Sequence, residues 1–217
     1  MSPTPVKKVR ALIRRARSED RAGERLLATL GRRRSKLHGA IKLPSDKADR
    51  ALRDFALRYI EHLPECVEAI SEMAREAKLS ARVQPLLNIA CDYFLTPPDL
   101  IRQHRHLEVL LDAAYLAHRL LEEINDHFMS QSSIPLAPMD TTRANIIAHE
   151  LIGEPFANEL DQAVLFSAEL LLNEYPFQGQ AFERYIKRHQ HRGWSEEVRR
   201  WPCLATQLDI DLRFNAP

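Results

Sequence analysis

Residues 105–128 have the sequence RHLEVLLDAAYLAHRLLEEINDHF, and the spacing of their apolar side chains decides the fold class. These side chains recur every three or four residues, which places them on one stripe of an α-helix. We therefore predict a long helix that buries this stripe against neighbouring elements. The stripe consists of Leu107, Leu110, Leu111, Ala114, Ala117, Leu121, Ile124 and Phe128.

Proline and capping residues divide the rest of the chain into further amphipathic segments. Ser45 is expected to cap a helix that stops at Pro64, where the next helix is expected to begin. No alternating β-branched run of useful length occurs, so the sequence predicts an all-α, multi-helix bundle with a basic N-terminal helical arm. Other helices are predicted over 81–95, 142–153, 156–173 and 177–191, with a last short helix that Ser195 caps and that ends at Trp201.

The formal net charge of the 217-residue chain is only +1, but the charge is unevenly distributed. Residues 1–42 contain thirteen Lys and Arg and three Asp and Glu, a net charge of +10. The remaining residues contain 18 basic and 27 acidic side chains, a net charge of −9. This division predicts an arm that binds a polyanion, or one that packs on the acidic body.

Apolar side chains in this arm keep helical spacing on both sides of Ser18, which is expected to cap a second helix. Three interpretations remain open: a helix packed on the body, contact with nucleic-acid phosphate, and contact with an anionic membrane. The arm contains no Phe, Tyr or Trp, so any nucleic acid would be bound through its backbone and not by stacking. The residues predicted to bind nucleic acid are Lys7, Lys8, Arg10, Arg14, Arg15, Arg17, Arg32, Arg33, Arg34 and Lys36.

Residues 92–101 have the sequence DYFLTPPDLI, and DAAYL follows at 112–116 after ten residues. This pattern resembles the YkvA-like family, a small bacterial helical domain of unknown function. In that family a helix ends in Tyr-Leu-x-x-Pro-x-Asp-Leu-Ile-Pro, and an Asp-Asp pair follows ten residues after the Ile. Pro97, Asp99 and Asp112 match, whereas Ala113 replaces the second Asp. A turn-bracing role for Asp99 and Asp112 is therefore preferred over a metal or catalytic site.

Four segments follow from the charge division and this resemblance. Residues 1–42 are predicted to form the basic arm, and the resemblance implies a YkvA-like helical domain over residues 43–128. Residues 129–141 are rich in Ser and Pro and are predicted to be a linker. Residues 142–217 are predicted to be a helical segment that packs on the same bundle.

Carboxylate and imidazole side chains come together at two places in the sequence. Glu123 and His127 share one helix face, and His149 and Glu150 lie near the end of a later helix. Two such helices can build a di-metal site in a bundle, and a metal-dependent enzyme would also use Glu122 and Asp126. The Glu-x-x-His spacing of those sites is absent from both segments, so solvated helix ends are the favoured interpretation and no cofactor is predicted.

The three cysteines lie far apart and form no CxxC pair, which argues against a disulfide framework or a structural zinc site. Cys66 and Cys91 are expected to be buried thiols. No apolar run approaches the about 20 residues that span a bilayer, so a soluble, cytoplasmic protein is predicted. No phosphate-binding loop or nucleophile elbow occurs either.

The sequence therefore predicts a non-enzymatic interaction protein whose basic arm contacts nucleic acid or a ribonucleoprotein. The alternatives are the metal-dependent helical enzyme and a peripheral membrane adaptor that binds anionic lipid. A protein partner is a further alternative. Trp194 and Trp201 flank an Arg-containing segment of the kind that binding interfaces favour, although partial burial of this segment against the bundle is the preferred interpretation.

Overall fold

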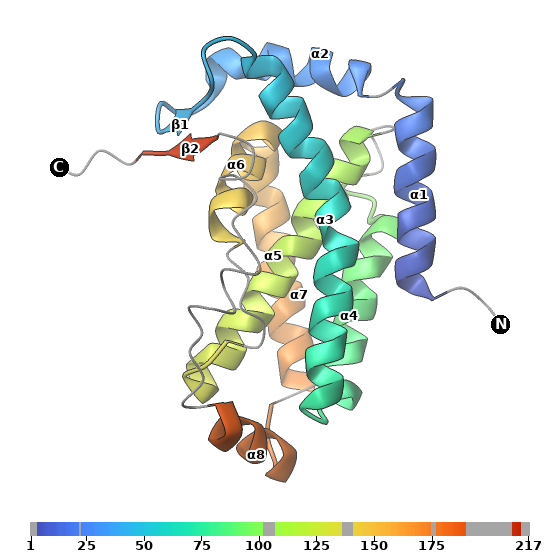
Figure 1. Ribbon diagram of the computed structural model, residues 1–217, viewed down its shortest axis with the longest axis vertical. Helices are drawn as coiled ribbons and strands as arrows, with labels where there is room; N and C mark the ends of the chain where they lie inside the picture. The colour runs from blue at the N-terminus through green and yellow to red at the C-terminus, as the bar shows by residue number, and fades with distance from the viewer. Residues whose placement is uncertain are drawn as a thin grey trace.

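The long helix predicted around residues 105–128 is present as α5 (Leu107–Ser132), which lies at the centre of a helical bundle (Figure 1). The computed structural model describes residues 4–21, 23–101, 107–135, 141–174, 177–189 and 210–213. Within these residues, eight α-helices and one short 3-10 helix account for most of the chain, so the all-α fold is confirmed. Side chains outside the predicted stripe, such as Leu116 and Leu120, are also buried, because α5 has neighbours on several sides.

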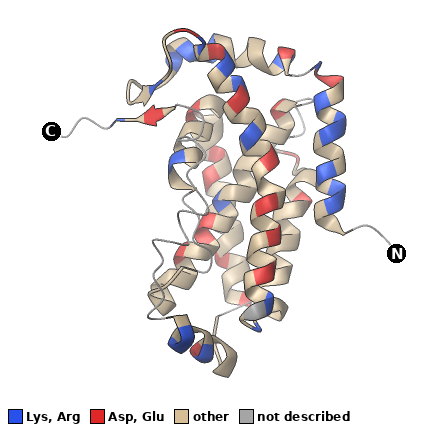
Figure 2. Cartoon of the chain, in the orientation of Figure 1, with Lys and Arg blue, Asp and Glu red and all other residues tan. Residues whose placement is uncertain are grey.

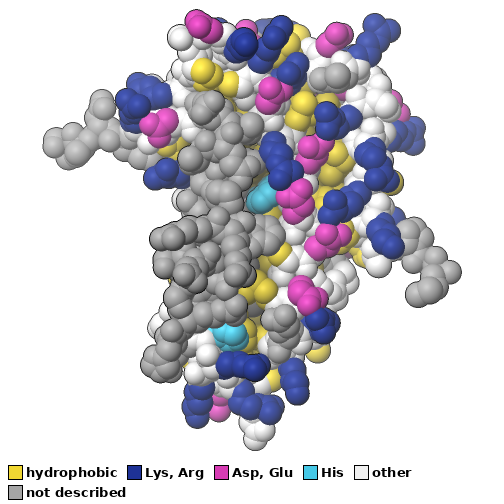
Figure 3. Space-filling model, viewed as in Figure 1, with side chains coloured by type: hydrophobic (Ala, Val, Ile, Leu, Met, Phe, Trp, Pro, Cys, Tyr) yellow, Lys and Arg dark blue, Asp and Glu magenta, His cyan; other side chains and the backbone are white. Residues whose placement is uncertain are grey.

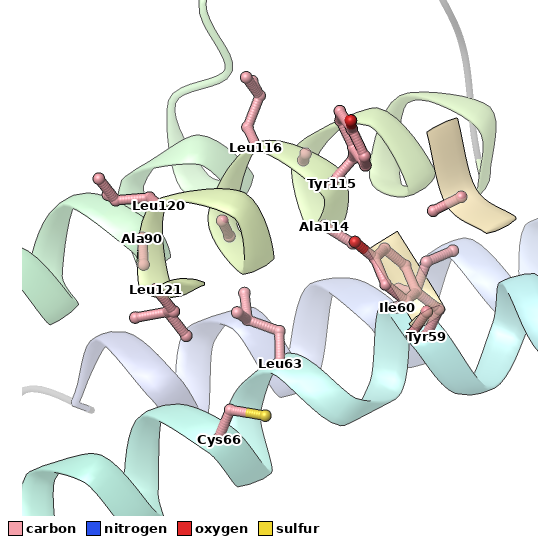
Figure 4. Packing of buried hydrophobic residues seen from close by; sticks show 14 of the residues in the cluster. Tyr59, Ile60, Leu63, Cys66, Ala90, Ala114, Tyr115, Leu116, Leu120 and Leu121 are labelled. Carbon is pink, nitrogen blue, oxygen red and sulfur yellow. The ribbon is translucent and has the colours of Figure 1, made fainter. Parts of the chain in front are cut away.

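α3 (Ala48–Glu76) and α4 (Ser80–Leu95) pack against α5 and against each other. In Figure 4, Leu63 and Cys66 extend from α3 and Leu121 extends from α5 within one buried cluster. The predicted stop at Pro64 is wrong, because Pro64 lies inside α3, which is 29 residues long. The predicted Ser45 cap is also wrong, since Lys47 occupies the position before α3.

The basic arm forms α1 (Pro5–Glu19), α2 (Glu24–Arg33) and the 3-10 helix η1 (Arg34–Lys36). α1 lies along α3 and α4, whereas α2 crosses one end of the bundle (Figure 1). Ser18 is not a cap as predicted: it lies inside α1, where its hydroxyl donates to the Arg15 carbonyl at 2.7 Å. The position before α2 is occupied by Gly23 in a left-handed conformation (φ 87°).

The C-terminal helices complete the bundle. α6 (Thr142–Ile152) and α7 (Phe156–Glu174) pack on α5, and α8 (Gln180–His189) lies at the end opposite α2 (Figure 1). α5 continues to Ser132, so the segment predicted as a linker starts later than residue 129. The helix predicted between Ser195 and Trp201 lies outside the described residues.

A two-residue strand pair was not expected from the sequence. β1 (Ile41–Lys42) pairs antiparallel with β2 (Asp211–Leu212), and the Arg213 N–H donates to the Ala40 carbonyl at 2.9 Å. This pair joins residues near the C-terminus to the end of the basic arm. None of the helices in the described part of the chain combines the length and the apolar character needed to cross a membrane.

Candidate functional site

The basic face of α1 is directed away from the bundle. Val9, Ile13 and Ala16 are buried on the side of α1 that packs against the body. Lys7 and Arg14 are exposed. They are seven residues apart, which is about two helical turns, so both lie on the side of α1 opposite the buried residues. Neither these two residues nor the exposed Lys8 pairs with an acidic side chain among the described residues.

Other bases of α1 form ion pairs with acids. The Arg10 guanidinium pairs with Glu68 of α3 at 2.6 Å, and Arg17 pairs with Glu61 of the same helix. In Figure 2, α1 carries several blue bands, and the neighbouring helix α3 carries a row of red bands. These exposed pairs contribute at most about 1 kcal/mol each. The interpretation of the arm as a helix packed on the acidic body therefore holds for α1, with part of its charge still directed to solvent.

The bases of α2 and η1 lie beside a broad groove. This groove has a volume of about 820 Å³ and runs between α2–η1 and the end of α6. Arg32, Arg33 and Lys36 line it, whereas Arg34 pairs with Asp49 of α3 at 3.3 Å. In Figure 3, dark blue side chains are spread over the regions of α1 and α2, with acidic side chains between them.

The α6 side of the groove is partly acidic. His149, Glu150 and Glu154 line it. The Glu150 Oε2 atom accepts the His38 backbone N–H at 3.0 Å, so one carboxylate is already used to hold the segment after η1. Arg33 lies against Gly153 at the end of α6, where a basic side chain interacts favourably with the negative end of the helix dipole.

A second polar cluster joins α5, α6 and α7 around Arg119. Its guanidinium pairs with Glu122, with Glu123 at 2.8 Å and with Asp161 of α7 at 3.1 Å. Burial opposes the charge of Arg119, but hydrogen bonding and attraction from these carboxylates, Glu122 foremost, outweigh it and raise its pKa. Three members of the cluster, Arg119, Glu122 and Asp161, line a pocket of about 250 Å³. Tyr115 also lines it, and its hydroxyl donates to Asp161 at 2.7 Å.

The four residues considered as metal ligands have separate partners. Glu123 pairs with Arg119, and the His127 ring is hydrogen-bonded to Gln131 at 2.8 Å. The His149 Nε2 atom lies 3.0 Å from Asn158 Oδ1 and 3.4 Å from Asp161, whereas Glu150 accepts the His38 N–H. His149 and Glu150 line one pocket, but Glu123 and His127 do not line it with them.

The two Asp residues of the YkvA-like pattern differ in burial. Asp99 is exposed in the turn after α4, where the Ile101 N–H donates to the Pro98 carbonyl at 3.1 Å. Asp112 is buried on α5, with only 3% of its surface exposed. The bracing of the turn by Asp112 stays a prediction, because residues 102–106 between them lie outside the described part of the chain.

A cluster that sequence reasoning missed lies between α3 and α5. His62 and Cys66 are one turn apart on α3, and the Cys66 Sγ atom lies 3.3 Å from His62 Nδ1. His118 of α5 is the third member, and one ligand atom from each of the three side chains lies within 4.8 Å of the others. The four-residue spacing of His62 and Cys66 was the available signal, but nothing in the sequence indicated His118.

Burial determines the ionisation of this cluster. Cys66 and His118 are almost completely buried, and His62 is half-buried. Burial raises the pKa of the Cys66 thiol, lowers the pKa of His62 and, with the neighbouring His62 ring, lowers the pKa of His118 to about 3. The three side chains are therefore uncharged at neutral pH.

The chain matches no family model, no curated protein and no solved structure. The YkvA-like resemblance thus stays a prediction that rests on residues 92–116.

Proposed function

We propose that the chain is a non-enzymatic binding protein whose N-terminal surface contacts the phosphate backbone of nucleic acid. The observation that carries this proposal is the orientation of α1. Its apolar side is buried in the bundle, so the helix is held rigidly while Lys7, Lys8 and Arg14 extend into solvent. Cations fixed on a folded surface attract phosphates without requiring a base sequence.

The bases at the groove extend this surface. Arg32 and Lys36 are exposed beside the groove between α2–η1 and α6, and neither pairs with an acid among the described residues. Arg33 has a second role at the end of α6. We assign Lys7, Lys8, Arg14, Arg32 and Lys36 to phosphate contact, and we assign Arg10, Arg17 and Arg34 to the attachment of the arm to α3.

The same orientation disfavours the anionic-membrane alternative. A helix that lies in a membrane interface inserts its apolar side among the lipid chains. In α1 that side is already used, because Val9 and Ile13 are 1% and 4% exposed. Membrane insertion would require α1 to leave the bundle, whereas phosphate contact uses the surface as it stands.

The experiment measures the binding of two triple variants to a fluorescently labelled nucleic-acid duplex by fluorescence anisotropy. Lys7→Ala/Lys8→Ala/Arg14→Ala removes three charges from α1, and Arg184→Ala/Lys187→Ala/Arg188→Ala removes three exposed charges from α8 at the other end of the molecule. For the α1 variant we expect weaker binding and a smaller slope of log K against log salt, reduced by about 1 for each lost phosphate contact.

The α8 variant should bind like the unmodified protein. An equal loss in both variants would show that only net charge matters, and absence of duplex binding by the unmodified chain would end the proposal. Vesicles with anionic lipid serve as a second ligand. Sedimentation with them, combined with no duplex binding, would favour the membrane alternative.

A further inference from the structure

The strongest unassigned cluster is the buried group formed by His62 and Cys66 of α3 and His118 of α5. It lies apart from the basic surface, and its residue types are those that bind transition metals. Thiolate and imidazole ligands select ions such as Zn²⁺ and Cu⁺, whereas Mg²⁺ and Ca²⁺ prefer oxygen. The ligand types of the group therefore favour a transition-metal ion over Mg²⁺ or Ca²⁺.

The His118 ring is oriented as a ligand would be. Its Nε2 atom lies 3.1 Å from the Tyr59 carbonyl oxygen, which can only accept, so Nε2 carries the hydrogen. The Nδ1 atom is then a lone-pair acceptor, and it is buried without a hydrogen-bond partner. Ligating histidines commonly donate their other ring N–H to a backbone carbonyl, which fixes the tautomer and the ring orientation. His118 has this arrangement: Nε2–H donates to the Tyr59 carbonyl, and Nδ1 has a lone pair that no donor uses.

The distances within the group are close to those of a tetrahedral site. With Zn–S about 2.3 Å and Zn–N about 2.0–2.1 Å, neighbouring sulfur and nitrogen ligands lie about 3.5 Å apart. Cys66 Sγ and His62 Nδ1 are already 3.3 Å apart, since residues four apart on α3 share a face. The ligand atoms lie within 4.8 Å of one another, so each pair would have to approach by at most about 1.3 Å to reach the separation found in a tetrahedral site.

We propose that His62, Cys66 and His118 bind one transition-metal ion of the Zn²⁺ type between α3 and α5. The ion takes the Cys66 sulfur as thiolate, and the thiol proton is released to solvent. The group supplies three protein ligands from the described residues, which leaves a fourth position for water or another small ligand. His62 is half-buried and forms the side from which the ion enters.

Such an ion would link α3 and α5, two helices that are far apart in the sequence and are brought together by the fold. His62 and His118 are 56 positions apart in the sequence, and their rings stack at a centroid distance of 5.7 Å. An ion that binds this folded arrangement and not the unfolded chain stabilises the fold by mass action. Without the ion, the site keeps a buried nitrogen that has no hydrogen-bond partner, which is unfavourable for the fold.

The first test is titration of the full, untagged, chelator-treated chain with Co²⁺, which reports thiolate ligation by its charge-transfer absorption. We expect saturation at one ion per chain and displacement by Zn²⁺. Cys66→Ala should abolish the charge-transfer band, and His62→Gln should weaken Co²⁺ binding while circular dichroism stays helical. Because His62 is half-buried, the second variant separates metal binding from folding.

Two matched controls are available. Cys91→Ala removes the other described buried thiol, and His127→Gln removes another half-buried histidine. Both should keep the Co²⁺ spectrum of the unmodified chain. A chain that binds neither Co²⁺ nor Zn²⁺, or a spectrum that survives in Cys66→Ala, overturns the proposal and leaves the group as a hydrogen-bonded Cys–His pair.

Discussion

The Tyr59 hydroxyl of α3 donates to Asn145 Oδ1 of α6 at 2.7 Å, and both residues are buried. The Asn145 amide then donates to Glu122 Oε2 of α5 at 2.6 Å. One amide side chain therefore joins three helices and gives the buried Tyr59 hydroxyl a hydrogen-bond acceptor. An unpaired buried polar atom costs about 1–3 kcal/mol, whereas a hydrogen bond contributes about 0.5–1.5 kcal/mol, so the link favours one relative position of the helices.

Tyr59→Phe should lower the free energy of unfolding by about 1–3 kcal/mol, because it leaves Asn145 Oδ1 without its donor. Urea denaturation of Tyr59→Phe, Asn145→Ala and the double variant measures the coupling between the two residues. We expect a coupling energy of about 0.5–3 kcal/mol. Strict additivity of the two single effects would contradict the link.

Much of the fold could be predicted from local pattern, because the apolar stripes of α4, α5, α6 and α7 have helical spacing and bounded ends. Pro64 shows where this reasoning ends. A proline inside a helix costs about 3 kcal/mol, whereas burial of each large apolar side chain contributes about 1.5–3 kcal/mol. Leu63 and Val67 are both buried on the continuous helix, so tertiary burial exceeds the local penalty.

The candidate sites were predicted unevenly for a related reason. Exposure of Lys7 and Arg14 follows from the positions of their apolar neighbours on one helix, which the sequence shows. His118 could not be grouped with His62 and Cys66, because their proximity depends on how α5 packs against α3. Glu123 and His127 do share a helix face, but Arg119 lies one turn before Glu123 and pairs with it.

Arg119→Gln should lower the free energy of unfolding by about 2–3 kcal/mol. Breaking a fully buried ion pair costs about 3–5 kcal/mol. We expect a smaller loss for Arg119→Gln, because the Arg119 side chain is 19% exposed. Arg75→Gln is the control, since Arg75 pairs with Glu72 but is 68% exposed and should cost less than about 1 kcal/mol. Equal losses in urea denaturation would mean that the Arg119 cluster adds nothing beyond a surface pair.

Gly153→Ala should destabilise the chain for a backbone reason. Gly153 has φ 83° and ψ 150°, a region essentially restricted to glycine, and strain there costs about 1–3 kcal/mol. A Cβ atom at this position would also overlap the Arg33 guanidinium. We expect the loss in thermal or urea unfolding to persist in Arg33→Ala/Gly153→Ala, because removal of the flexible side chain leaves the backbone strain.

Gly39→Ala serves as the control for that experiment, since a Cβ there meets nothing within 4 Å and its backbone has no positive φ. This variant should unfold within about 0.5–1 kcal/mol of the unmodified chain. Full recovery of stability in the Arg33→Ala/Gly153→Ala variant would instead assign the loss to the steric overlap.

Cys91 should make the fold sensitive to alkaline pH. Burial, aided by the charge of Asp92, raises the pKa of the Cys91 thiol to about 11 from its ordinary value of 9.0. Between these values the unfolded chain has lost the proton and the folded chain has kept it, so stability falls as pH rises. We expect the free energy of unfolding to drop more between pH of about 8 and about 10 in the unmodified chain than in Cys91→Ala. Because Tyr and Lys titrate in the same range in both proteins, the difference between the two drops isolates the thiol, and equal drops would contradict the shift.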